Sequence, residues 1–183
     1  IQEFLDQEST SSLENRHKFA EITSSIAYYL KSFSNINKFL DYICLILKHV
    51  FNEKIILIIP FNYEGGIWNE NIKITVNNEF LKIQDEIYFL LKNFNFSKNI
   101  KIKEILTFEN SLKEILKEYK MEKEKILSRG KCRGFIYIFS KDLSSDSIKD
   151  DSYFNFIQNC LAIGLENYYL IQKNKRHEKV DRE

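Results

Sequence analysis

Apolar residues recur at helical spacing in three stretches of the chain, residues 19–33, 36–50 and 151–175. Each of the first two stretches predicts a helix with one apolar side, whereas the third carries two apolar stripes. These stripes are Phe154, Ile157, Leu161, Leu165 and Tyr168 on one side, and Tyr153, Phe156, Cys160, Ile163 and Leu170 on the other. A helix that is apolar on two sides has to be covered on both, so we expect it to pack on its own domain and on a second helix or chain.

Strand patterns occupy the middle and the later part of the chain. Residues 54–61 are apolar almost throughout, which is typical of a central strand covered on both faces. Residues 62–66 predict a turn that contains two glycines, and the alternation over 67–76 predicts an antiparallel partner strand. Residues 132–140 are rich in aromatic and β-branched side chains and predict a further strand, entered by a tight turn from a strand at 123–128.

The remaining segments connect these elements. Residues 79–91 predict a helix, residues 100–105 a short strand and residues 110–119 a second helix. Lys and Glu are interleaved from Lys113 to Lys125, a pattern typical of a solvated helix face. A polar loop that ends at Asp151 provides an N-cap for the closing helix. The helix of residues 36–50 is capped by Asn35 or Asn37, and its expected buried positions are Ile36, Phe39, Leu40, Ile43, Cys44, Leu47 and Val50.

The order of these elements predicts an α+β protein with α/β/α layers and a central, mostly antiparallel sheet. The 183 residues suffice for one domain with a sizeable core, and the 44% hydrophobic and 29% charged content is that of a globular protein. The longest apolar run, Ile55 to Phe61, is too short to cross a bilayer. The net charge of +1 gives no argument for nucleic acid or anionic lipid, so we expect neither a membrane nor a nucleic-acid partner.

The sequence contains no recognisable catalytic or metal-binding motif. Glycine-rich phosphate loops, G-x-S-x-G and H-E-x-x-H are absent, and the three histidines, His17, His49 and His177, are widely separated. Cys44, Cys132 and Cys160 are also far apart, which favours packed free thiols in a reduced, cytoplasmic protein over a metal site. We therefore expect no catalytic residue, no metal and no cofactor.

Three places in the chain resemble the GAF domain, a small sensory and regulatory fold. Residues 19–33, 39–51 and 55–61 are similar to the entry helices and first strand of that family, and residues 128–140 to one of its hairpins. The sequence FIQNCLAIGLENYYL is similar to its closing helix through Ala162, Ile163, Leu165, Glu166, Asn167, Tyr168 and Leu170. The resemblance implies that the long N-terminal and C-terminal helices pack together on one face of the sheet.

The resemblance also implies a ligand pocket between the sheet and the crossover segment of residues 79–119. The residues that would line it are Phe61, Trp68, Ile74, Ile87, Phe108 and Tyr137. The alternative is that most of these side chains fill the same space as core. The signature of the cyclic-nucleotide-binding members is not matched, because Phe39 follows Asn37 and Lys38 directly. The signature of the bilin-binding members is not matched either, because no cysteine is followed directly by a histidine. We expect an unidentified small molecule as ligand, if one binds.

The family resemblance makes the closing helix the relay of a signal. Its expected dimer and relay residues are Phe154, Ile157, Leu161, Gly164, Leu165 and Tyr168. One side would pack on the sheet or on the helix of residues 19–33 and the other on a second chain, and Gly164 inside the helix indicates a close helix contact. The resulting hypothesis is a non-catalytic sensory domain that forms a homodimer and relays a signal to a downstream output domain in the same chain.

The expected organisation is an N-terminal extension in residues 1–15, a GAF-like domain in 16–172 and the start of a linker helix in 173–183. Because the chain starts at Ile1 and ends in charged helical sequence, we expect it to be part of a longer polypeptide. The linker resembles those that precede metal-dependent serine phosphatase or histidine kinase domains. Two alternatives remain: a vestigial fold that binds no small molecule and serves in dimerisation or protein docking, and an enzyme with an unrecognised site.

Overall fold

The computed structural model describes residue 21 and residues 35–61, 71–75, 81–93, 102–141 and 146–182, with only the backbone for 81, 102 and 176–182. Residues 1–34 and 35–183 form separate compact units, and all helices and strands discussed below belong to the second unit. The predicted helix of residues 19–33, the turn of residues 62–66 and Trp68 lie outside the described residues. Among the described residues, no helix combines the length and the apolar character needed to cross a membrane.

The centre of the second unit is an antiparallel sheet with the strand order β2-β1-β4-β3. Its strands are β1 (Lys54–Pro60), β2 (Lys73–Thr75), β3 (Lys120–Ser128) and β4 (Lys131–Ser140). The central position of β1 follows from its continuous apolar sequence, because every residue after Lys54 is buried. The expected strands at residues 54–61, 123–128 and 132–140 are confirmed, and β2 lies within the stretch of residues 67–76 whose alternation predicts a strand.

The turn between β3 and β4 consists of Arg129 and Gly130, both with positive φ, 51° and 76°. Two left-handed residues twist the connection in the sense that antiparallel strands require. The pairing then changes register, since Leu127 lies opposite Cys132 whereas Ile126 lies opposite Gly134. Arg133 is thus an extra residue in β4, a β-bulge that turns its side chain away from the regular alternation of the strand.

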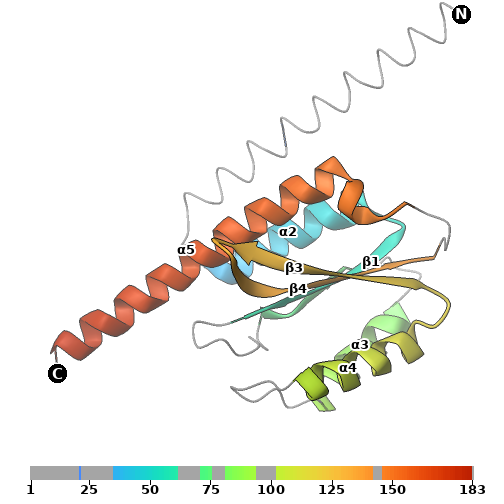
Figure 1. Ribbon diagram of the computed structural model, residues 1–183, viewed down its shortest axis with the longest axis horizontal. Helices are drawn as coiled ribbons and strands as arrows, with labels where there is room; N and C mark the ends of the chain where they lie inside the picture. The colour runs from blue at the N-terminus through green and yellow to red at the C-terminus, as the bar shows by residue number, and fades with distance from the viewer. Residues whose placement is uncertain are drawn as a thin grey trace, which may run out of the picture. The chain divides into compact units, whose positions relative to one another are not determined.

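Helices α2 (Ile36–Val50) and α5 (Ser152–Arg182) lie together over one face of the sheet, as Figure 1 shows. The predicted cap of α2 is confirmed, because the Asn35 side chain accepts a hydrogen bond from the Asn37 amide. Five of the seven expected core positions of α2 are buried, while Cys44 and Val50 are half-buried, and Ile46 is buried in addition. A short 3₁₀ helix, η3 (Ile148–Asp150), leads into α5.

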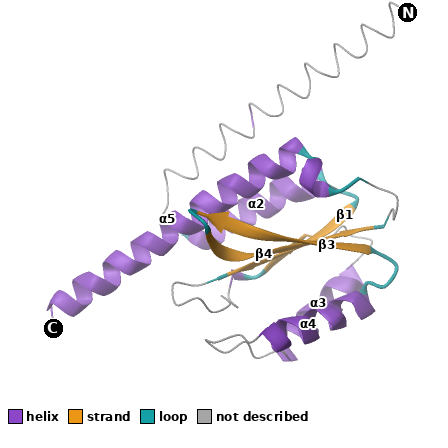
Figure 2. Cartoon of the chain, viewed as in Figure 1, coloured by secondary structure: helices purple, strands orange, loops and turns teal. Residues whose placement is uncertain are grey.

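Helices α3 (Leu81–Asn93) and α4 (Ile102–Ile115) cover the opposite face of the sheet (Figure 2). The predicted strand at residues 100–105 is wrong, because α4 begins at Ile102. The reason is visible in the spacing of Ile105, Phe108 and Leu112, which are three and four residues apart and lie on the side of α4 that faces the sheet. The α+β class with helices on both faces of an antiparallel sheet is confirmed.

The interpretation of residues 113–125 as a solvated helix face is also wrong for its second half. Residues 120–125 belong to β3, where the period of two places Lys123 and Lys125 on the α4 side of the sheet. Glu122 and Glu124 lie on the α5 side, next to η3. Interleaved Lys and Glu thus produce a basic and an acidic face in a strand, whereas in a helix they would be mixed.

Replacement of Asp151 by Ala is expected to lower the free energy of unfolding by about 1 kcal/mol. The Asp151 carboxylate accepts hydrogen bonds from the amides of Tyr153 and Phe154, at 2.9 and 3.1 Å, and so caps the first turn of α5. Urea denaturation followed by circular dichroism measures the loss, with Asp150→Ala at the neighbouring exposed position as the control. Equal stability of the two variants would contradict the capping role.

Candidate functional site

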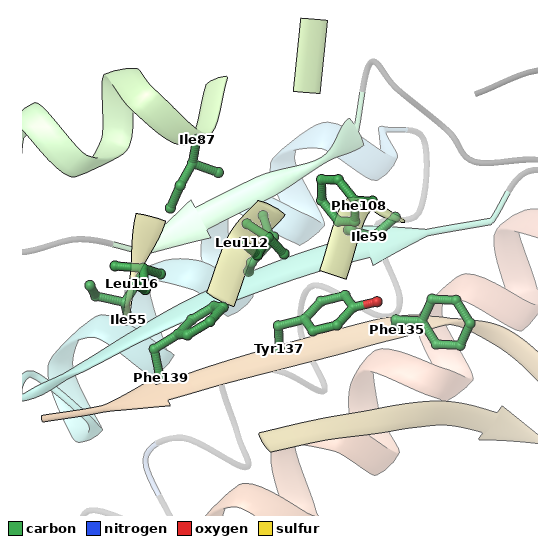
Figure 3. Close-up of a cluster of buried hydrophobic side chains, with 10 residues drawn as sticks. Ile55, Ile59, Ile87, Phe108, Leu112, Leu116, Phe135, Tyr137 and Phe139 are labelled. Carbon is green, nitrogen blue, oxygen red and sulfur yellow. The ribbon is translucent and has the colours of Figure 1, made fainter. Parts of the chain in front are cut away.

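The predicted pocket residues converge on the α4 face of the sheet. Ile87, Phe108 and Tyr137 belong to one buried cluster, and Phe61 and Ile74 pack against it; Trp68 lies outside the described residues. Figure 3 shows Phe135, Tyr137 and Phe139 in a row along β4, beneath the side chains of the helices. Ile87, Phe108 and Tyr137 are each at most 1% exposed. These side chains therefore contribute to the core that joins α3 and α4 to the sheet.

A charged residue is buried next to this apolar cluster. Glu109 of α4 is 8% exposed, and its Oε1 accepts hydrogen bonds from the Tyr137 hydroxyl at 2.7 Å and from the Lys123 ammonium at 2.5 Å. A buried carboxylate without such partners would strongly destabilise the fold. The three side chains come from α4, β4 and β3, so this polar cluster ties the crossover helix to two strands.

The Tyr137 hydroxyl serves as a hydrogen-bond donor in this cluster. Burial raises the pKa of Tyr137 well above its usual value, and the hydrogen bond to Glu109 and the negative charge of Glu109 raise it further. The phenol consequently stays protonated at neutral pH and cannot act as a base there. This arrangement is suited to holding α4 in place or to binding a cation.

Aromatic rings surround the cationic end of the cluster. The Lys123 Nζ lies 4.2 Å from the centroid of the Phe135 ring and 5.8 Å from that of Tyr137. Phe135 in turn makes edge-to-face contacts with Phe61 and Tyr137, at centroid distances of 5.1 and 6.3 Å. The ammonium group is thus held by a carboxylate and by ring faces, both of which attract positive charge.

A second buried ion pair lies on the opposite face, where α5 crosses the sheet. The bulged Arg133 of β4 donates from Nε to Glu166 Oε2 at 2.6 Å, and its guanidinium lies 4.1 Å from the centroid of the Tyr169 ring. The two paired side chains are only 13% and 10% exposed. The bulge is what directs Arg133 toward α5, so an irregularity of the strand fixes the position of the helix.

The predicted relay residues of α5 lie mainly inside the domain. Phe154, Ile157, Leu161 and Leu165 are buried, Tyr168 is half-buried, and Gly164 packs against the ring of Phe39 on α2. The close helix contact expected at Gly164 is confirmed. Among the α5 residues whose side chains the structure describes, 152–175, Ile163 is the large apolar residue that is exposed, and it belongs to the other stripe. At Ile163, the side of α5 that faces outward is therefore the stripe that begins at Tyr153, and not the stripe of the predicted dimer and relay residues.

The cysteines have the character of packed thiols. Cys160 is buried, and Cys44 and Cys132 are half-buried. Burial raises the pKa of Cys44 to about 12, so its thiol is protonated at neutral pH and is a poor nucleophile and metal ligand. Within the described ranges, no three His, Cys, Asp or Glu side chains are grouped so that they could hold a metal ion.

Sequence patterns identified the apolar part of the candidate site but not its charges. The sequence pattern places Lys123 on a solvated helix face and Arg133 at an ordinary strand position, and it assigns no role to Glu109. A signal for Glu109 exists, since it directly follows the apolar-face residue Phe108 and therefore borders the buried side of α4. The bulge at Arg133 depends on pairing with β3 and has no local signature.

Comparison of the sequence with family models finds no match, and comparison with curated proteins finds none either.

Proposed function

We propose that residues 35–183 form a non-catalytic sensory or regulatory domain of the GAF type from a cytoplasmic signalling protein. One observation carries the proposal: strand β4 links the buried polar cluster under α4 to the buried ion pair on α5. Tyr137 contacts Glu109 on one face of the sheet, and Arg133 contacts Glu166 on the other. The layered arrangement and the residue patterns shared with GAF domains support the same assignment.

The proposed mechanism is a change of position of α4 that is passed through β4 to α5. A ligand acts only if it binds one arrangement of these elements better than another, and such coupling typically amounts to ~1–3 kcal/mol. Helix α5 is suited to the output side, because it runs for 31 residues and continues past the edge of the sheet in Figure 1. A downstream phosphatase or kinase domain would receive the shift from the end of this helix.

The proposal includes a homodimer formed by the outer helical layer. Leu45 of α2 and Ile163 of α5 are 64% and 50% exposed, and a second chain on this layer would cover both side chains. Sedimentation equilibrium of the chain measures the association, and Ile163→Asp is the variant expected to weaken it. A monomer whose mass is independent of concentration would remove the dimer from the proposal.

A thermal-shift screen with metabolites and nucleotides tests the sensory role. A ligand that binds the native state is expected to raise the melting temperature, by about 2–4 °C for each kcal/mol of stabilisation. Spin labels attached at the exposed Lys173 position on α5 of each protomer then report whether the same ligand changes the distance between the two helices. A ligand that stabilises the domain but leaves this distance unchanged would contradict the relay.

One observation favours a second function, a vestigial fold that acts as a dimerisation or protein-docking module. The residues expected to line a pocket are packed into the core, with Ile87, Phe108 and Tyr137 almost completely covered. Under this alternative the screen yields no ligand, while the association of the chain persists. The combination of the two measurements distinguishes the functions.

A further inference from the structure

The cluster around Glu109 has the composition of a site that recognises an ammonium group. Glu109 supplies a buried carboxylate oxygen, and the ring of Phe135 supplies an electron-rich face 4.2 Å from the cation that it now contacts. Tyr137 holds the carboxylate in place through its hydroxyl and adds a second ring. A carboxylate combined with ring faces attracts a cation and repels an anion, and this combination is how proteins recognise alkylammonium ligands.

We propose that Glu109, Tyr137 and Phe135 form a binding site for the ammonium group of a small ligand, and that Lys123 fills this site as a tethered substitute. This inference rests on the proposed sensory function for its biological role, but the site itself is argued from its contacts alone. The edge-to-face contact between Phe61 and Phe135 fixes the ring that covers the cation. The ring that covers the cation is therefore held by a contact that does not involve the cation.

Lys123 is placed so that its ammonium group can move out of the site. It lies on β3, the last strand of the sheet, and its side chain is 30% exposed, whereas Arg133 in the other buried pair is 13% exposed. The lysine side chain has a flexible four-carbon stem and a strongly hydrated ammonium group. The ammonium group can therefore move into the solvent beside the strand. Arg133 is held by its stacking on Tyr169 and by its carboxylate partner. Of the two pairs, the one under α4 is thus the exchangeable one.

The covalent attachment of Lys123 next to the site sets the minimum affinity that a ligand needs in order to displace it. A side chain attached next to its site competes at a high effective concentration, typically in the millimolar range for short tethers. A simple amine cannot displace it, whereas an amine with further contacts to the neighbouring surface can. Displacement would release the ion pair that joins β3 to α4, and this is the change that the proposed function would pass to α5.

The test removes the tether and supplies the cation in solution. Lys123→Ala and Lys123→Thr both empty the site, and Thr introduces a β-branched side chain, which is favourable in a strand. Ethylammonium chloride is expected to raise the melting temperature of both variants by about 2–4 °C more than sodium chloride at equal ionic strength. In the double variant Lys123→Ala/Glu109→Gln, the two salts are expected to raise the melting temperature equally. The same equal effect is expected for Lys123→Met, because the methionine side chain still covers the rings.

The possible results of this experiment test the ammonium site separately from the proposed sensory function. Equal effects of the two salts on both single variants would overturn the site, and so would a specific effect of ethylammonium that persists after Glu109→Gln. If both single variants are unfolded in sodium chloride, refolding in ethylammonium alone supports the site and failure to refold contradicts it. Specific stabilisation without any change in the α5 label distance would keep the ammonium site and remove the sensory role.

Discussion

Replacement of Gly164 by Leu is expected to lower the free energy of unfolding by about 3 kcal/mol or more, the upper range for overpacked cores. A Cβ atom at this position of α5 would already overlap the ring of Phe39, which is 2% exposed and belongs to the core. The better helix propensity of Leu recovers at most about 1 kcal/mol. Urea denaturation gives the stability, and sedimentation gives the association state of the same sample.

Two further variants show whether the ring contact causes the loss. Gly164→Ala adds only the clashing Cβ and is expected to cost less than Leu, while Asn159→Leu at an exposed position of α5 is expected to change stability by less than about 0.5 kcal/mol. In a double-mutant cycle, Phe39→Leu is expected to make Gly164→Ala less harmful, because the smaller side chain removes the overlap. Unchanged stability and association of Gly164→Leu would refute the close contact.

The second large effect is expected at the ion pair between β4 and α5. Arg133→Met removes the partner of Glu166 and leaves a carboxylate in a position that is only 10% exposed. Removal of one member of a buried pair typically costs about 3–5 kcal/mol, because the remaining charge has lost both its partner and its water. Chemical denaturation at neutral pH measures this loss.

The matched double variant Arg133→Met/Glu166→Leu is expected to regain most of the stability, since neither charge is then buried alone. The single variant Glu166→Leu leaves Arg133 with its stacking on Tyr169, so its cost is expected to be smaller. A double variant that is no more stable than Arg133→Met would show that the loss comes from apolar packing of the arginine stem and not from the unpaired charge.

Elements whose burial pattern is local were predictable from the sequence. The continuous apolar run of β1, the Asn35 cap of α2 and the stripe of α5 around Leu161 each contain their own signal. The errors lie at α4 and β3, where the pattern was read with the wrong period. Ile100 and Ile102 are two residues apart, as in a strand, and the helical spacing emerges only when Ile105 and the residues that follow it are included.

The charged parts of the candidate site could not be predicted because they depend on contacts between distant residues. Glu109 meets Lys123 only after α4 has packed on the sheet, and Arg133 reaches Glu166 only through a bulge that is defined by pairing with β3. In isolation each of these residues resembles a surface charge. Sequence periodicity reports the average environment of a face, whereas a buried ion pair is an exception to that average.

The separation of charges on the two faces of β3 determines how copies of the sheet can meet. If two β3 strands paired edge to edge in antiparallel fashion, each face of the sheet would continue into the same face of the other copy. Lys123 and Lys125 would then lie among lysines, and the glutamates of the opposite face among glutamates, and like charges on adjacent strands repel. The charges on the two faces of β3 therefore oppose the pairing of this edge of the sheet with the same edge of a second copy.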